Sequence, residues 1–294
     1  MEKTMLLSTQ TSHMVNALGF EEGILTLKRA GYDALDLSLF SMTRNDSPYV
    51  GDGWREYTEA QRRFADANGI VFNQAHAPFS FKWDDPAVRE GTAQPRVLRS
   101  FEIAAMMGAD TIIVHPLHYC EYKGHEEEMH ELNLAYYRSM IPYCREYGIK
   151  VAVENMWQND RRRRFITYDV AAHPEELAAY IDELDSEWIV ACLDLGHCGL
   201  VGEEADNCIR ILGHDRLKAL HVHDNNYRED SHTMPGMGLM NWDAICSALH
   251  DINYDGEFTY EADSFLRNFP KDYLERAAAF MVQTGRYLID KIGL

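Results

Sequence analysis

The sequence predicts an α/β fold in which residues 1–294 form one domain, a single (β/α)8 barrel, also called a TIM barrel. Short apolar runs, typical of strands buried on both faces of a parallel sheet, recur eight times. Segments with helical periodicity separate them, and several end at a glycine, which adopts the left-handed cap conformation at little cost. The sequence has no G-x-G-x-x-G motif after its first apolar run, so we expect a closed barrel rather than an open dinucleotide-binding sheet.

The expected strands follow one another at the spacing of repeated strand and helix units. They cover residues 4–11, 34–39, 70–75, 111–115, 150–154, 189–194, 219–223 and 258–261. The expected helices between and after them cover residues 21–30, 54–68, 88–107, 127–147, 174–183, 242–250 and 271–291. Glycine closes helices in the segments "KRAGYDALDLSL", "DANGIVFNQA", "MMGADTIIV" and "REYGIKVAV", each of which then enters a strand.

Charge and cysteine usage narrow the functional class. The chain has 28 Lys and Arg against 47 Asp and Glu, a net charge of −19, which repels a phosphate backbone and predicts no nucleic-acid partner. The six cysteines form no C-x-x-C pair, which is typical of reduced thiols in a cytoplasmic protein. We see no signal peptide and no apolar run of the roughly 20 residues that cross a bilayer, so no membrane association is expected. Assembly into a homo-oligomer stays open.

Polar side chains that bind metals or move protons end six consecutive strands. Because TIM barrels carry their active sites at the carboxyl ends of the strands, these residues should meet at one rim. The residues are His76, His115, Glu154, Asp194 with His197, His221 with His223, and Glu261. Taken singly, such a carboxylate could be a helix cap and such a histidine a core residue.

Together, the rim carboxylates predict a bound divalent cation. Carboxylates at contact distance repel one another by a few kcal/mol at an effective dielectric of about 20, and a cation removes that repulsion. Glu154, Asp194, Glu261 and one histidine form a mostly oxygen ligand set, which favours Mn²⁺ or Mg²⁺, with Co²⁺ or Zn²⁺ as alternatives. Such an ion acidifies a carbon beside a carbonyl, and Glu154 and Glu261 could remove and return its proton through an enediolate.

The ordered motifs resemble the xylose-isomerase-like TIM-barrel superfamily, which includes ketose 3-epimerases, inosose dehydratases, hydroxypyruvate isomerases and endonuclease IV. The motifs are "HAPF", "VHP", "VEN", "DLGH", "HVHDN" and "DSHTMPGMG", followed by the glutamate that ends the last strand. The epimerase branch implies Glu154, Asp194, His221 and Glu261 as metal ligands, where His221 rather than His223 fits the H-x-x-D spacing to Asp224. The resemblance also implies substrate contacts for His197 and Arg228.

The resemblance to endonuclease IV leaves the number of metals and the reaction open. That branch adds metal-binding histidines after the third and fourth strands and a D-x-H pair, which correspond to His76, His115, Asp230 and His232. In sugar enzymes, residues such as His76, His115, His223 and His232 can instead hydrogen bond to substrate hydroxyls. We therefore expect a metal-dependent sugar or polyol isomerase or epimerase of carbohydrate metabolism, acting on a sugar, polyol or sugar phosphate. The alternatives are a zinc-dependent DNA repair endonuclease, a dehydratase or lyase, and a non-catalytic carbohydrate-binding barrel.

A run of four arginines stands out in this acidic chain. Residues 161–164 lie in the loop expected after the fifth strand. Arginine binds phosphate and carboxylate oxygens through two parallel hydrogen bonds, so a phosphorylated or acidic substrate would explain the run. The simpler interpretation is a solvent-exposed loop.

Overall fold

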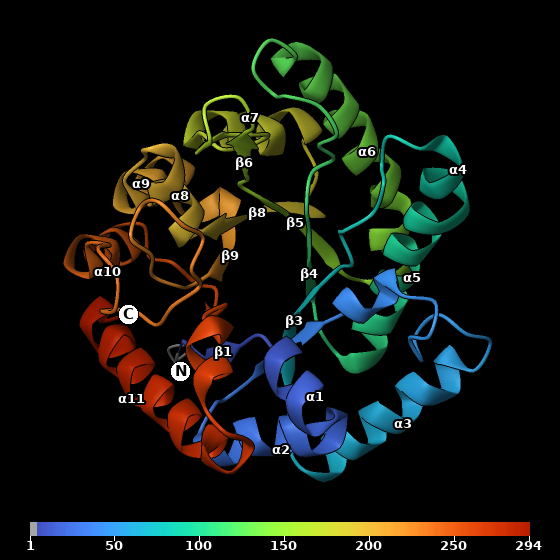
Figure 1. Ribbon diagram of the computed structural model, residues 1–294, viewed down its shortest axis with the longest axis vertical. Helices are drawn as coiled ribbons and strands as arrows, with labels where there is room; N and C mark the ends of the chain where they lie inside the picture. Colours follow the sequence, from blue (N-terminus) through green and yellow to red (C-terminus); the bar gives the residue numbers. More distant parts are fainter. Residues whose placement is uncertain (1–4) are drawn as a thin grey trace.

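The computed structural model describes residues 5–294, in which eight parallel strands form the inner ring and helices the outer ring (Figure 1). The strands are β1 (Leu7–Thr9), β2 (Leu35–Ser38), β3 (Phe72–His76), β4 (Thr111–Val114), β5 (Lys150–Glu154), β8 (Ile189–Asp194), β9 (Leu217–His221) and β10 (Phe258–Tyr260). The six strands from β2 to β9 pair in chain order, and β1 pairs with β10. Single parallel bridges from Gln10 to Asp36 and from Val222 to Tyr260 join the two sheets. The predicted TIM barrel is confirmed.

The outer ring follows the expected alternation. The helices are α1 (Ser12–Leu18), α2 (Phe20–Ala30), α3 (Trp54–Ala67), α4 (Pro86–Val88), α5 (Gln94–Met107), α6 (Glu126–Tyr147), α7 (Pro174–Leu184), α8 (Leu195–Val201), α9 (Ala205–Arg216), α10 (Trp242–Asp251) and α11 (Leu274–Ile292). Gly31, Gly108 and Gly148 end α2, α5 and α6 in the left-handed conformation, as their sequence positions predict. Among the described residues, no helix is both long and apolar enough to cross a membrane.

Several boundaries differ from those expected. Thr4, the start of the first expected strand, lies outside the described residues. The seventh strand runs two residues earlier than expected, from Leu217 to His221, and Val222 and His223 follow it. Helices α8 and α9 cover residues 195–201 and 205–216, where no helix was predicted. The helical segment expected at 88–107 starts with a wider π turn over Arg89–Ala93 before α5.

The interior of the barrel is closed by small and branched side chains from the central strands. Ile113, Ala152, Val190, Cys192 and Ala219 form a separate buried cluster, all 5% exposed or less. The larger apolar core lies between the strands and the surrounding helices. Because apolar packing fills the barrel below them, the polar residues at the strand ends have a rigid base.

A two-stranded antiparallel hairpin follows β5, where only a loop was predicted. It consists of β6 (Trp157–Asp160) and β7 (Phe165–Tyr168), and the four arginines form its turn. Asp160 Oδ1 accepts the backbone N–H groups of Arg162 and Arg163, and the Arg163 side chain returns to Asp160 Oδ2 at 2.9 Å. The hairpin extends one side of the rim on which the polar strand ends meet.

Candidate metal centre and active site

A cavity of about 710 Å³ opens at the carboxyl ends of the strands. Its size falls within the roughly 300–1,000 Å³ typical of small-molecule sites. Seven of the residues expected at the site line it, and they are His76, His115, Glu154, His197, Asp230, His232 and Glu261. Phe40, Phe79 and Trp157 add aromatic surface. The cavity therefore combines apolar walls with convergent ionisable groups.

Four buried side chains gather at the base of this cavity. Glu154, Asp194, His221 and Glu261 each offer one ligand atom, and these atoms lie within 4.8 Å of one another. His221 Nδ1 lies 2.9 Å from Glu154 Oε1 and 3.2 Å from Glu261 Oε2. Since β5, β8, β9 and the residue after β10 supply these groups, four parts of the barrel converge on one point. We call these four residues the acidic donor group.

Glu154 also faces two histidines on its other side. Glu154 Oε2 lies 2.9 Å from His115 Nε2 and 3.6 Å from His76 Nε2, yet it accepts no well-aligned hydrogen bond from the described residues. The two imidazole nitrogens, His76 Nε2 and His115 Nε2, are 3.1 Å apart. The carboxylate of Glu154 thus lies between two sets of donors, which suits a ligand shared by neighbouring cations.

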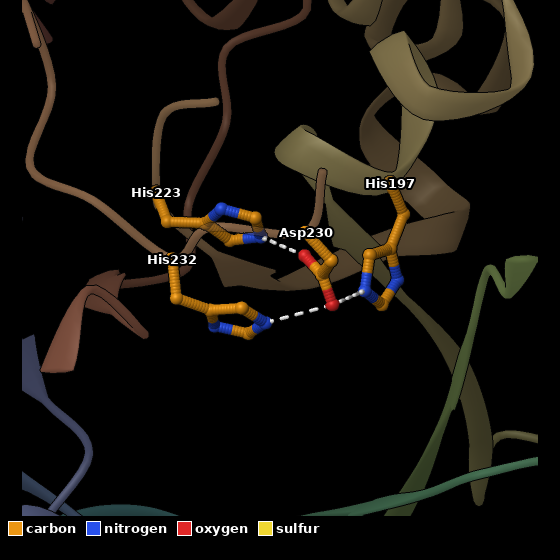
Figure 2. Close-up of side chains that lie close together, drawn as sticks. All are labelled: His197, His223, Asp230 and His232. Carbon is orange, nitrogen blue, oxygen red and sulfur yellow. Dashed lines mark hydrogen bonds and ion pairs between the residues drawn. The ribbon is translucent and has the colours of Figure 1, made fainter. Parts of the chain in front are cut away.

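A second donor group lies beside the first, and we call it the histidine donor group. It comprises His197, His223, Asp230 and His232, whose ligand atoms also lie within 4.8 Å of one another. Figure 2 shows the Asp230 carboxylate between the three imidazoles. The His223 and His232 rings stack with centroids 4.1 Å apart, and His223 Nε2 also lies 2.9 Å from Asp194 Oδ1. Asp230 Oδ1 has no hydrogen-bond partner among the described residues although it is buried.

The hydrogen bonds of three histidines leave the second ring nitrogen free to act as a ligand. His76, His197 and His232 direct Nδ1 at the backbone carbonyls of Ala77, Asn155 and Glu261, at 2.7–2.9 Å. Because Nδ1 donates its proton to each carbonyl, Nε2 of the neutral ring carries a lone pair. Histidines that bind metals are held in this way. His232 Nε2 lies 3.1 Å from Asp230 Oδ2, and two such acceptors need a cation, a proton or a metal, between them.

The electrostatics of the site also favour bound positive charge. Burial alone would raise the pKa of the Glu154 carboxyl, but the imidazoles of His221 and His115 hold that pKa well below its usual value. Burial lowers the pKa of His197, yet Asp194 and Asp230 raise it to about 10. The residues present therefore fit divalent cations in donor number, in hydrogen-bond direction and in charge.

Asp224 organises the loop that carries part of the histidine donor group. Its buried carboxylate accepts four N–H groups, from the backbone of Asn225, Gly236 and Met240 and from the Trp242 indole. A Cβ at Gly238 would lie 2.2 Å from Asp224 Oδ1, so only glycine allows this approach. The H-x-x-D motif thus marks a structural carboxylate that fixes the loop bearing Asp230 and His232.

Some residues at the site have positions that the sequence did not indicate. Arg228, expected to contact substrate, is exposed and does not line the cavity. Gln10 Nε2–H donates to Glu261 Oε1 at 3.0 Å, a contact that no sequence motif indicates. His118 also lines the cavity and pairs with the buried Asp169 at 2.6 Å. The histidine after "VHPL" was visible in the sequence, but nothing there linked it to an aspartate in a later loop.

Comparison with known proteins gives relatives that include a sugar epimerase and a probable endonuclease. An uncharacterized protein of Methanocaldococcus jannaschii is 29% identical over 213 residues, which cover 68% of this chain and 69% of that protein. A D-psicose 3-epimerase of Enterocloster bolteae is 34% identical over 87 residues, 30% of this chain and 27% of the epimerase. A probable endonuclease 4 of Heliobacterium modesticaldum is 27% identical over 192 residues, 60% of this chain and 65% of that protein.

Solved structures share the fold along nearly the whole chain. A D-tagatose 3-epimerase-like protein superposes with a TM-score of 0.75 at 19% identity and covers 98% of both chains. The IOLI protein with a bound zinc atom gives a TM-score of 0.68 at 15% identity, also covering 98% of both chains. A family model described as "Xylose isomerase-like TIM barrel" matches residues 24–284. With that match, and with eight strands whose ends carry the predicted donors, the chain belongs to the xylose isomerase-like TIM barrel family.

Proposed function

We propose that this protein is a divalent-metal-dependent isomerase or epimerase of a sugar or polyol, acting by proton transfer at a carbon next to a carbonyl. The observation that carries the proposal is the acidic donor group at the base of a cavity of about 710 Å³. The sugar epimerases among the structural neighbours and the D-psicose 3-epimerase among the relatives support it. A dehydratase or lyase could use the same proton abstraction.

We assign the main metal to the acidic donor group, with Mn²⁺ or Mg²⁺ as the preferred ions and Co²⁺ or Zn²⁺ as alternatives. A second metal is proposed in the histidine donor group, where three imidazoles and one carboxylate suit Zn²⁺ better than Mg²⁺. When bound, the main metal polarises the carbonyl and lowers the pKa of the adjacent C–H group.

Glu154 and Glu261 are the proposed acid/base pair. Both line the cavity, so their carboxylates can reach a bound substrate on two sides. Gln10 holds Glu261 through the Nε2 to Oε1 hydrogen bond, and its own carbonyl oxygen accepts the backbone N–H of Ser12 at 3.1 Å. This second bond fixes the direction of the amide, which makes Gln10 a positioning residue for Glu261. Phe79 and Trp157 line the same cavity, where their aromatic rings would shield a bound substrate from water.

Turnover in D₂O tests the proposed proton transfer. The protein is first loaded with metal, and full occupancy is verified. It is then assayed with a panel of ketoses, polyols and their phosphates that includes D-psicose, D-tagatose and D-fructose. We expect deuterium at the carbon beside the carbonyl of the product, read by proton NMR. A Glu261→Gln variant that keeps its metal should lose this exchange. Turnover without deuterium would disprove the paired-glutamate mechanism, because a hydride shift between adjacent carbons leaves no solvent label.

An endonuclease is the second candidate, because His76, His115, Asp230 and His232 line the cavity together with Glu154 and Glu261. This arrangement suits a three-metal centre, and the probable endonuclease 4 relative adds to it. The net charge of −19 weighs against it, since duplex binding requires many cationic contacts. Cleavage of an oligonucleotide with one abasic site by the zinc-loaded protein would favour this candidate over the sugar enzyme.

A further inference from the structure

One wall of the cavity carries an imidazole and a guanidinium that belong to neither donor group. His118 comes from the loop between β4 and α6, and Arg161 comes from the turn between β6 and β7. A hydrogen bond from the backbone N–H of Tyr122 to Gln158 Oε1, 3.4 Å long, joins the loop to the hairpin. The two loops therefore form one continuous wall.

Arg161 differs from the other arginines of its turn. Asp160 accepts the backbone N–H groups of Arg162 and Arg163 and binds the Arg163 guanidinium, so the turn folds back on that carboxylate. Arg161 lines the cavity and has no ion-pair or hydrogen-bond partner among residues 5–294. Arg267, the second arginine on the cavity surface, is instead paired with Asp263 at 3.1 Å. Arg161 thus presents an unpaired guanidinium to the cavity.

His118 is held by a buried carboxylate from a later loop. Its Nδ1 lies 2.6 Å from Asp169 Oδ2, and the Asp169 side chain is 1% exposed whereas that of His118 is 45% exposed. Asp169 Oδ1 accepts the backbone N–H of Val170 at 2.9 Å, which fixes the carboxylate. The hydrogen bond to Asp169 raises the pKa of His118. A ring held at Nδ1 in this way can present Nε2–H to a ligand.

Donors of this kind recognise oxyanions. The Gln158 side chain also lines this wall, and its Nε2 is buried and has no hydrogen-bond partner among the described residues. Glu121 also lines this wall; it and Arg161 are both exposed, so solvent screens both charges, and no ion pair forms between them. We infer that the wall formed by His118, Gln158 and Arg161 binds an anionic group, a carboxylate or a phosphate, on the substrate. The inference rests on the proposed function and narrows its substrate class to acidic or phosphorylated sugars.

Calorimetric binding to the metal-loaded protein tests this inference without requiring turnover. The probes are D-glucitol, D-gluconate and D-glucitol 6-phosphate, which share a six-carbon chain and differ in charge. We expect at least one anion to bind about tenfold more tightly than D-glucitol, and the stronger of the two identifies the preferred group. Equal affinity for the neutral and both anionic probes would overturn the inference and leave the proposed function intact.

Matched variants assign the effect to the wall. Arg161→Gln and His118→Gln should each weaken binding of the anion about tenfold and leave D-glucitol binding unchanged. Arg162→Gln removes the same charge from the same turn but from a residue that does not line the cavity, so it should change affinity less than twofold. An equal loss of anion affinity in Arg161→Gln and Arg162→Gln would mean that the anion responds only to the overall charge of the turn. The proposed anion site would then be rejected. Anion binding by a protein that turns over no sugar would keep the site and reject the proposed function.

Discussion

Asp224→Asn should loosen the loop between β9 and α10 without disturbing the barrel. Asp224 is 0% exposed, and its two oxygens each accept two N–H groups at 2.8–3.2 Å. An asparagine has the same shape, but its NH₂ group cannot accept hydrogen bonds. Whichever way the amide is oriented, two of the four donors lose their acceptor inside the protein.

The free-energy cost of Asp224→Asn can be estimated from the two donors that lose their acceptor. A hydrogen bond to a charged acceptor contributes about 1.5–3 kcal/mol, so losing two costs about 3–6 kcal/mol. Removing a buried charge recovers part of this, because an ionised carboxylate is itself costly to bury. We expect a net decrease of about 3 kcal/mol in the free energy that holds the loop closed. Trp242→Phe is the matched control, since it removes one donor and keeps an aromatic ring, and it should cost about half as much.

Hydrogen exchange and metal analysis measure the outcome. Amides of residues 225–241 should exchange faster in Asp224→Asn, while those of the central strands β4 and β5 keep their protection. Since the loop carries Asp230 and His232, metal should be lost from the histidine donor group and retained by the acidic donor group. Two results would contradict this prediction. One is that the amides of residues 225–241 exchange no faster in Asp224→Asn than in the wild type, and the other is that Asp224→Asn is destabilised no more than Trp242→Phe.

Three further predictions concern the two donor groups and the cavity wall. Glu154→Gln or Asp194→Asn should lose metal and activity, while the melting temperature of the metal-free barrel falls little. Mass spectrometry would measure the bound metal and calorimetry the melting temperature. Full metal occupancy in either variant would contradict the ligand assignment. Gly196→Ala would place a Cβ 2.0 Å from the His223 ring, so it should displace that ring, cost about 1–3 kcal/mol and reduce bound metal by one equivalent. Gly91→Ala is the matched control, because its Cβ meets no atom within 4 Å and Gly91, like Gly196, has no positive φ. The ion pair with Asp169 raises the pKa of His118, so its stabilisation is complete below the unfolded pKa of about 6.5 and is lost as pH rises through the folded pKa. The nearby charged residues Glu121 and Arg161 are the same in both proteins. Asp169→Asn should therefore lower the free energy of unfolding more at pH 6 than at pH 9. An equal loss at both pH values would contradict an ion pair between His118 and Asp169.

The sequence predicted the barrel and most of the rim because both depend on local patterns. Apolar strand runs and helix-ending glycines recur at regular spacing, and parallel strands bring their carboxyl ends to one face whatever the loops do. Glu154, Asp194, His221 and Glu261 could be expected together for this reason. The β6–β7 hairpin was missed because four consecutive arginines resemble a solvated loop, whereas Asp160 folds that run into a turn. The pairing of His118 with Asp169 depends on two loops whose conformations are set by tertiary contacts.

The two proposed functions, a sugar enzyme and an endonuclease, use similar metal ligands. The charge of the surface around those ligands distinguishes between the two functions. A duplex-binding protein that contacts 6–10 phosphates loses about 10³–10⁵ in affinity between 50 and 200 mM salt. The Lys and Arg side chains on the described cavity surface are Arg161 and Arg267, and Asp263 already neutralises Arg267. The cavity thus offers one free guanidinium, in a protein with a net charge of −19. Any binding of an abasic duplex should therefore weaken by less than about tenfold over that salt range, as fluorescence anisotropy would measure. A steeper dependence would show a cationic surface that the cavity lacks, and would favour the endonuclease.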